Sequence, residues 1–230
     1  MRRLTVVLLG GVALVAAFAL AGCGGETTRA NAPDTPAATG TAAPPTPAEE
    51  PVTPLEEQKE TSIKGPQYVD IEKYELVVDG MVDRPLRLKY SDILAMQADT
   101  RVVRLDCVEG WGLTARWTGV PLEDILNLAG VKAGAKEVIF RAVDGYSSSL
   151  HLDYATSGKV LLAYLDNGEP LSPERGFPLQ VVAEGKWGYK WVKWLDHIQL
   201  IDQDFRGYWE LWGFNNEGDA VSGLEMEPGR

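Results

Sequence analysis

Arg104-Leu105-Asp106-Cys107-Val108-Glu109-Gly110-Trp111 is the stretch that decides the interpretation of this sequence, because its cysteine has no evident partner. The chain has two cysteines, Cys23 and Cys107, and Cys23 follows the leader-like residues 20–22. The mature protein is therefore expected to keep one free thiol. Such a thiol in an exported protein is oxidised unless it is buried or holds a ligand. We expect Cys107 to mark the functional site.

Mostly strands, with a few helices, are predicted around this stretch. Apolar runs that end in Asp144-Gly145 and Asn167-Gly168 predict short strands joined by tight turns. The run 121–130 has Pro at its start and Gly at its end, which is typical of a helix. Because strands and helices do not alternate regularly, the expected fold class is α+β. Strands are expected over 74–80, 138–143, 161–165, 179–183 and 191–201, and helices over 91–96 and 121–130.

Most familiar site chemistries have no motif in this sequence. The histidines are His151 and His197, with no HExxH or CxxC pattern, which argues against a zinc or iron–sulfur site and a c-type haem. No GxSxG, P-loop or GxGxxG pattern occurs either. His197 lies in a strand-like run and is predicted to be structural.

Several ordered blocks resemble one known family. Between 74 and 212 the sequence is similar to the molybdopterin-binding domain of the sulfite oxidase family, especially the bacterial branch that includes the periplasmic methionine sulfoxide reductase catalytic subunit. The resemblance implies a sulfite-oxidase-type fold of mixed, mainly antiparallel β-sheets with a few helices. The blocks are Arg104-x-x-Cys107-Val108-Glu109-Gly110-Trp111, Trp117-Thr118-Gly119-Val120-Pro121-Leu122, Asp144-Gly145-Tyr146-Ser147, 162–171, Gly176-Phe177-Pro178-Leu179 and 188–195.

The resemblance also implies a cofactor, molybdenum-molybdopterin, with Cys107 as the protein ligand to the metal. A thiolate is a soft, electron-donating ligand that must be deprotonated to bind. In the family, the metal exchanges an oxygen atom with a small substrate and passes electrons singly to a carrier. This chain has no haem motif, so a separate electron carrier is expected, such as a haem protein or a membrane subunit.

The loop 188–193 matches the family's basic loop around the pterin phosphate, and Lys190 and Lys193 are its phosphate candidates. Relatives place His or Asn where this chain has Arg175, and Arg where it has Gln180. A neutral Gln lacks the bidentate charge of Arg, and Arg175 is a nearby source of that charge. The expected cofactor-binding residues are Gly188, Lys190, Trp191, Val192, Lys193, Arg175 and Gln180.

The expected catalytic residues are Tyr146, Arg104 and Glu109. Arg104 is a candidate for binding an oxyanion, although alternate strand residues point to opposite faces, so a structural role is as well supported. Glu109 and Tyr146 are expected near the metal, with Tyr146 donating to a bound oxygen. Trp111 suits the pocket or the core equally. Core packing is favoured for the tryptophans at 187, 191, 194, 209 and 212.

The N-terminus resembles a bacterial lipoprotein signal. Arg2 and Arg3 precede the uncharged run 4–22, which ends in small residues before Cys23. The length would also suit a membrane span, and both Sec and twin-arginine export stay open. We expect residues 1–22 to be removed. A lipid on Cys23 would then anchor the protein to the outer face of a cell-envelope membrane, on its periplasmic or extracellular side.

The next segment is expected to be a disordered tether. Residues 23–64 are rich in Ala, Pro, Thr and Glu and have few large apolar side chains, so burial cannot repay the entropy of ordering them. The remaining residues, 65–230, are enough for one domain with its own core.

Net charge excludes one class of partner. The chain has 22 basic and 33 acidic residues, a net charge of −11. Loss of Arg2 and Arg3 with the signal leaves 20 against 33, or −13. Such a surface repels nucleic acid and anionic lipid, whereas a local basic pocket can still bind a small anion.

Two functions from different classes are compatible with the sequence. The first is a lipid-anchored molybdopterin oxidoreductase that transfers an oxygen atom to or from a sulfite- or sulfoxide-type substrate. The second is a cofactor-free lipoprotein that keeps the fold as a binding or scaffold module. Gln180 and Arg175 favour the second function, and the intact block around Cys107 favours the first.

Overall fold

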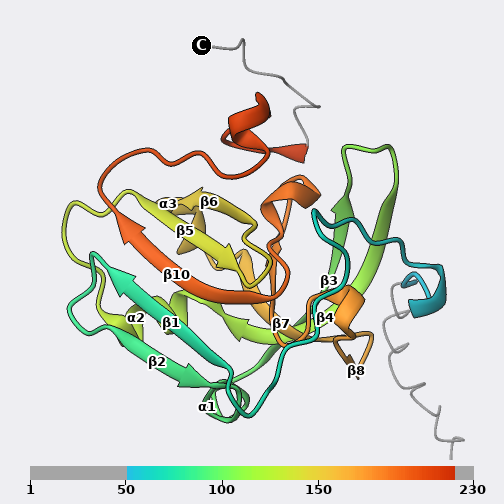
Figure 1. Ribbon diagram of the computed structural model, residues 1–230, viewed down its shortest axis with the longest axis horizontal. Helices are drawn as coiled ribbons and strands as arrows, with labels where there is room; N and C mark the ends of the chain where they lie inside the picture. The colour runs from blue at the N-terminus through green and yellow to red at the C-terminus, as the bar shows by residue number, and fades with distance from the viewer. Residues whose placement is uncertain (1–50, 221–230) are drawn as a thin grey trace, which may run out of the picture. The chain divides into compact units, whose positions relative to one another are not determined.

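The computed structural model describes residues 51–220 (Figure 1). The expected signal peptide, the expected lipidation site at Cys23 and the tether up to residue 50 lie outside the described residues, as do residues 221–230. Within the described part of the chain, no helix is long and apolar enough to cross a membrane.

Two five-stranded sheets form the domain (Figure 1). In the first sheet β1 and β10 pair in parallel, and the other neighbours are antiparallel. Its order is β2 (Leu86–Lys89), β1 (Glu75–Gly80), β10 (Leu195–Ile201), β5 (Glu137–Ala142) and β6 (Ser147–His151). The second sheet is antiparallel and contains β3 (Asp99–Asp106), β4 (Gly112–Pro121), β7 (Val160–Asp166), β8 (Glu169–Pro170) and β9 (Gln180–Ala183).

Helices are few and short, which confirms the α+β class. In α2 the buried positions Leu122, Ile125, Leu126 and Ala129 recur at helical spacing, so one apolar face meets the core. Gly130 ends α2 with a φ of 73°, a conformation that favours glycine. The α-helices are α1 (Tyr90–Leu94), α2 (Leu122–Ala129) and α3 (Leu152–Ala155), and the 3₁₀ helices are η1 (Leu55–Glu57), η2 (Pro173–Arg175), η3 (Gly188–Lys190) and η4 (Glu210–Trp212).

The core is one apolar cluster to which both sheets contribute. Phe140 and Ile198 from the first sheet and Leu162 from the second are fully buried. Trp117 packs edge-on against Trp191, with ring centroids 5.8 Å apart. Each such side chain contributes roughly 1.5–3 kcal/mol of burial free energy as an upper bound. This core fixes the strand ends from which the site residues project.

One expected strand begins later than predicted. The run 191–201 is extended only from Leu195, because η3 precedes it and Trp194 has a φ of 52°. The expected opposite phase of Trp191 and Trp194 along a strand therefore does not apply.

The structure also corrects the expected boundary between tether and domain at residue 64. Thr53 N donates to Thr114 O at 2.7 Å, and the buried Gln58 donates to Asp166 Oδ1 at 3.2 Å. Figure 1 shows the chain after η1 passing across β3 and β4 before it reaches β1. Residues 51–64 are held mainly by polar contacts of this kind, which an estimate from apolar composition does not count.

Candidate active site

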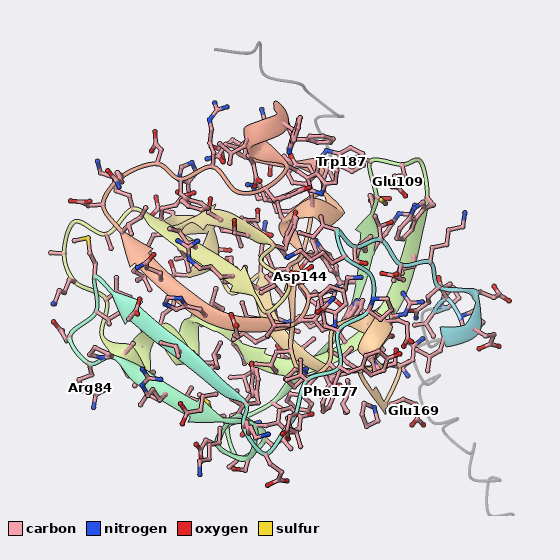
Figure 2. The ribbon with its side chains drawn as sticks, viewed as in Figure 1. Arg84, Glu109, Asp144, Glu169, Phe177 and Trp187 are labelled. Atoms are coloured by element: carbon pink, nitrogen blue, oxygen red, sulfur yellow. The ribbon has the colours of Figure 1, made fainter. Side chains whose placement is uncertain are left out.

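Cys107 lies on the turn that joins β3 to β4. The turn is closed by hydrogen bonds from Gly110 N to Cys107 O (3.0 Å) and from Cys107 N to Trp111 O (2.8 Å). Gly110 has a φ of 82°, so glycine suits the tightest point of the turn. In Figure 2, Glu109 lies at the tip of this hairpin and Asp144 lies nearer the centre of the domain. The turn thus holds the half-buried thiol at the end of two paired strands.

Cys107 lies in the wall of a cavity of about 240 Å³, called the cavity below. Segments 59–63, 107–111, 174–180 and 188–194 all contribute to its lining. Arg104, Lys190 and Val192 do not line it. The expected site residues that the structure brings together here are Cys107, Glu109, Tyr146, Arg175, Gln180, Gly188, Trp191 and Lys193.

Gly188 allows the 188–193 loop to approach the Cys107 turn closely. A Cβ added at Gly188 would lie 3.3 Å from Leu105 Cδ2 and 3.4 Å from Asp106 O, with Cys107 Cα at 3.8 Å. Asp106 and Trp187 form a parallel β-bridge at the same place. These contacts bring Cys107 and the loop into one site, although they are far apart in sequence.

The thiol is protonated more readily than an exposed cysteine. Burial raises the pKa of Cys107, and the Glu109 carboxylate raises it further, while a hydrogen bond from the Glu109 backbone lowers it. A thiolate here needs a cation to stabilise it. Glu109 itself accepts from Trp111 Nε1 at 3.1 Å and from Thr61 Oγ1 at 3.2 Å.

Asp144 lines the cavity and has one carboxylate oxygen that lacks a hydrogen-bond partner among the described residues. Its side chain is 3 % exposed, and Oδ1 accepts from the backbone N of Tyr146 at 2.9 Å. Oδ2 is buried and has no hydrogen-bond partner among the described residues. A buried carboxylate oxygen without a donor is costly, so this position suits a ligand that brings an N–H or O–H group.

The Tyr146 hydroxyl is already engaged, which differs from its expected role as a donor to a bound oxygen. It donates to the backbone oxygen of Tyr189 at 2.5 Å. Burial raises the pKa of Tyr146 well above its ordinary value, and Glu210 adds to that shift. Tyr146 therefore holds the 188–193 loop through this hydrogen bond and also lines the cavity.

Cationic groups gather at the part of the cavity formed by η2 and Lys193. Lys193 Nζ lies 2.7 Å from Glu60 Oε2. Arg175 Nη1 donates to Lys59 O at 2.7 Å, and Nη2 donates to Gln58 O. Burial lowers the pKa of Lys193 and of Arg175, and neighbouring carboxylates partly offset both shifts.

Lys190 is not at the cavity, which corrects its expected role as a phosphate ligand. Its side chain is fully buried, with Nζ 2.7 Å from Glu210 Oε1 and 3.1 Å from Ser149 O. Burial lowers the pKa of Lys190, and Glu210 raises it. The 3₁₀ turn η3 directs Lys190 toward β6, away from the side on which Gly188 lies.

Arg104 and Val192 also differ from their expected roles. Arg104 Nε lies 2.8 Å from Asp106 Oδ1, and the Arg104 side chain is 61 % exposed. Strand alternation turns it away from the cavity, as the competing interpretation anticipated. Val192 is fully buried, and its carbonyl accepts from Val181 N at 2.8 Å.

Sequence reasoning missed several cavity residues. Trp209 and Phe214 lie in the wall, with ring centroids 5.6 Å apart, although core packing was expected for Trp209. Trp212 differs further, since it is 69 % exposed. Asp144 was not predicted as a site residue, although it lies in the block Asp144-Gly145-Tyr146-Ser147 that resembles the family, and that block was the signal from which its role could have been predicted. Nothing in the composition of segment 59–63 indicated a role in the site.

Comparisons with known proteins identify the family of this chain. The oxidoreductase molybdopterin binding domain model matches residues 63–209, more than half of the chain. The uncharacterized oxidoreductase YuiH of Bacillus subtilis (strain 168) is 41 % identical over 155 residues, which cover 67 % of this chain and 78 % of YuiH. Sulfite oxidase of Arabidopsis thaliana is 31 % identical over 174 residues, covering 60 % of this chain and 44 % of that protein.

A solved structure is similar in fold. The sulfane dehydrogenase SoxCD from Paracoccus pantotrophus superposes with a TM-score of 0.64 at 26 % identity, covering 68 % of this chain and 45 % of that one. This chain thus spans about half the length of SoxCD and of the plant sulfite oxidase. The matched residues 63–209 include Cys107, Asp144 and the 188–193 loop, and the protein is accordingly an oxidoreductase of the molybdopterin-binding sulfite oxidase family.

Proposed function

We propose that this protein is a lipid-anchored, extracytoplasmic molybdopterin-dependent enzyme that transfers an oxygen atom to or from a small, uncharged sulfoxide-type substrate. The observation that carries the proposal is the half-buried thiol of Cys107 in the wall of a cavity that is also lined by Asp144, Arg175 and Lys193. A packing role alone would not require a thiol, an unpaired carboxylate oxygen and cations at one cavity.

The residues present fit molybdenum-molybdopterin. Cys107 supplies a soft sulfur ligand. Asp144 Oδ2 is an unpaired acceptor for an N–H donor of the pterin ring. Lys193 and Arg175 are cations suited to a phosphate, and Gly188 leaves room where a Cβ would crowd the Cys107 turn. When bound, the cofactor supplies the exchange of an oxygen atom and of two electrons at the metal.

The protein's own groups would then shape the chemistry around the thiol. Trp111, Trp209 and Phe214 line the cavity, where they exclude water and offer apolar surface to a substrate. Glu109 lies in the same turn as Cys107 and is held by Trp111 and Thr61. The Glu109 carboxylate orients hydrogen-bond donors of a substrate and repels anionic substrates.

The charge near the thiol favours an uncharged substrate over sulfite. Arg104, the cation expected to bind an oxyanion, is paired with Asp106 outside the cavity. Glu109 adds a negative charge beside Cys107. Two similar proteins are named for methionine sulfoxide reduction: a putative subunit YedZ1 of Azospira oryzae, 31 % identical over 64 % of this chain and 56 % of its own length, and the catalytic subunit MsrP of Xanthomonas campestris.

A substitution at Glu109 tests the substrate class. Glu109→Gln removes the charge and keeps the shape, so the ratio of kcat/KM for sulfite to that for a dialkyl sulfoxide is expected to rise about tenfold, since one such charge contact is worth roughly 1–2 kcal/mol. Steady-state assays with an artificial electron donor or acceptor measure both values. An unchanged ratio would remove Glu109 from substrate selection.

Anchoring and electron transfer complete the proposal. Cys23 would carry the lipid and hold the domain at the outer face of a membrane, on the periplasmic or extracellular side. The names of YedZ1 and MsrP, each a subunit, support a separate redox partner such as a haem protein or a membrane subunit.

A cofactor-free binding module is the second candidate. It is favoured by one observation: the Arg175 guanidinium already donates to backbone carbonyls of segment 55–59, and Gln180 carries no charge for a phosphate.

Metal analysis decides between the two functions. Protein purified from its native envelope is expected to contain nearly one molybdenum per chain. Cys107→Ala should lower that content at least about tenfold, because it removes the metal's protein ligand. Arg104→Gln is the matched control and should leave the content unchanged. A metal-free, well-folded wild-type protein would reject the enzyme and leave the binding module.

A further inference from the structure

The segment 58–64, called the strap below, forms one wall of the cavity. Its residues Lys59 to Ile63 line the cavity beside Cys107, Arg175 and Lys193. It enters the domain from η1 and continues toward β1 (Figure 1). The strap therefore separates the cavity from solvent on this side.

Glu60 of the strap forms an ion pair with Lys193, the cation at the cavity that is best placed to bind an anion. Lys193 Nζ lies 2.7 Å from Glu60 Oε2 and also donates to Glu174 O at 3.2 Å. The Lys193 side chain is 14 % exposed and that of Glu60 is 29 % exposed. A carboxylate and a phosphate ester both present anionic oxygens, so both satisfy the same ammonium group.

Arg175 holds the backbone of the same strap. It donates to the carbonyl oxygens of Lys59 and Gln58, and more weakly to that of Leu55 at 3.5 Å. These contacts neutralise no charge, so they position the strap without filling the anion site. Arg175 is therefore a positioning residue for the strap.

The remaining strap contacts reach the thiol end of the cavity. Thr61 Oγ1 donates to Glu109 Oε2 at 3.2 Å, and Lys64 Nζ donates to Asp144 O. At the other end, Gln58 Nε2 donates to Asp166 Oδ1 at 3.2 Å. Most of these are single polar contacts at partly exposed side chains, which release at low cost compared with an apolar core.

We infer that the strap is a gate over the cavity, that the Glu60–Lys193 ion pair holds it closed, and that a phosphate-bearing occupant opens it by taking the place of Glu60 at Lys193. The inference rests on the proposed function for the identity of the natural occupant. The contacts that hold the strap are made by residues of the chain itself.

Hydrogen exchange and thiol labelling test the gate directly. The full chain is purified from cells that cannot make molybdopterin, as wild type, Glu60→Gln and Glu57→Gln. Glu57 lies in η1, is exposed and does not line the cavity, so its substitution is the matched control. Glu60→Gln is expected to speed amide exchange in the strap and alkylation of Cys107 by iodoacetamide about fivefold, because a partly exposed ion pair is worth about 1 kcal/mol. Glu57→Gln should change neither rate.

A second arm uses inorganic phosphate as the probe. Phosphate, compared with chloride at the same ionic strength, should speed exchange of the strap in the wild type and have no effect in Lys193→Gln. Amides of β10 in the same protein report whether the fold is intact. Equal rates for Glu60→Gln and Glu57→Gln would overturn the gate, and so would phosphate that slows exchange, since the anion and the strap would then bind together.

The test separates this inference from the proposed function. Protein from cells that make molybdopterin should show faster strap exchange than protein from cells that do not. If no cofactor is ever bound, the first two arms still decide whether Glu60 holds the strap. If cofactor is bound but the strap exchanges equally with and without it, the gate is wrong and the proposed function stands.

Discussion

Lys190 and Lys193 belong to one short loop, yet they lie on opposite sides of it and do different work. Lys190 is fully buried against Glu210, whereas Lys193 lies at the cavity against Glu60. The buried side of the loop attaches the C-terminal segment with Trp209 and Phe214 to the sheet, and the cavity side meets the strap. Of the two lysines in this basic loop, Lys190 thus contributes to stability and Lys193 is placed for binding.

Removal of Lys190 is the strongest test of this division. Lys190→Met leaves the buried Glu210 carboxylate without its cation and with the hydrogen bond from Ser148 Oγ, which is expected to destabilise the protein by about 3–5 kcal/mol. Lys193→Met breaks a partly exposed pair and should cost about 1 kcal/mol. Urea unfolding of the full chain measures both free energies of unfolding.

A double variant completes the comparison. Lys190→Met with Glu210→Gln removes both buried charges and should recover about 1–3 kcal/mol of the loss. If Lys190→Met and Lys193→Met destabilised the protein equally, the division of the loop into a buried side and a binding side would be wrong.

The next largest effect is expected at Asp144, which lines the cavity, and it concerns the binding of the cofactor. Asp144→Asn keeps an acceptor for the Tyr146 backbone and turns the unpaired oxygen into a donor. Molybdopterin content, measured by fluorescence of its oxidised derivative, should fall about tenfold because a mismatched buried polar group costs roughly 1–3 kcal/mol. Asp106→Asn is the control on the exposed Arg104 pair and should retain the cofactor. Full retention by Asp144→Asn would mean that Oδ2 meets no pterin donor.

The sequence allowed the prediction of features that depend on local chemistry. The α+β class and helix α2 followed from short-range patterns around Pro121 and Gly130. The lone cysteine of the mature chain and a family block led to Cys107, which lies on a turn at the cavity wall. For Arg104, strand alternation supported only the competing structural interpretation, and the residue was still expected to be catalytic.

What could not be predicted depends on pairing across long distances in sequence. Lys190 has its partner in Glu210, and Arg175 meets the strap through backbone carbonyls, which no residue-type pattern encodes. Segment 51–64 has the composition of a tether, yet it is ordered by polar contacts such as those of Thr53. The sequence therefore predicted a role where it depends on one side chain, and not where it depends on contact between two distant segments.

The smallest effect concerns how the buried side of the loop extends to the C-terminal segment. Glu137 is buried, accepts from Ser149 Oγ at 2.6 Å and lies 2.7 Å from His151 Nδ1. His151 Nε2 lies 2.7 Å from Glu217, so the imidazole joins the sheet to this segment. Burial alone would lower the pKa of His151, but Glu137 and Glu217, with a smaller effect of Asp204, outweigh it and raise that pKa. Lys190 also acts on Glu137, whose own pKa burial raises.

The sign of the pH effect follows from that shift. Since the folded pKa of His151 lies above the ordinary value of about 6.5, its stabilising contribution is complete below that pH and is lost as the pH rises through the folded pKa. The contribution should be under about 1 kcal/mol because the His151 side chain is 40 % exposed. The difference in unfolding free energy between wild type and His151→Gln, followed by urea titration, should therefore shrink from pH 6 to pH 9. A difference that stays constant over this range would mean that His151 holds the C-terminal segment as a neutral ring, leaving the Lys190–Glu210 pair as the charged attachment on the buried side of the loop.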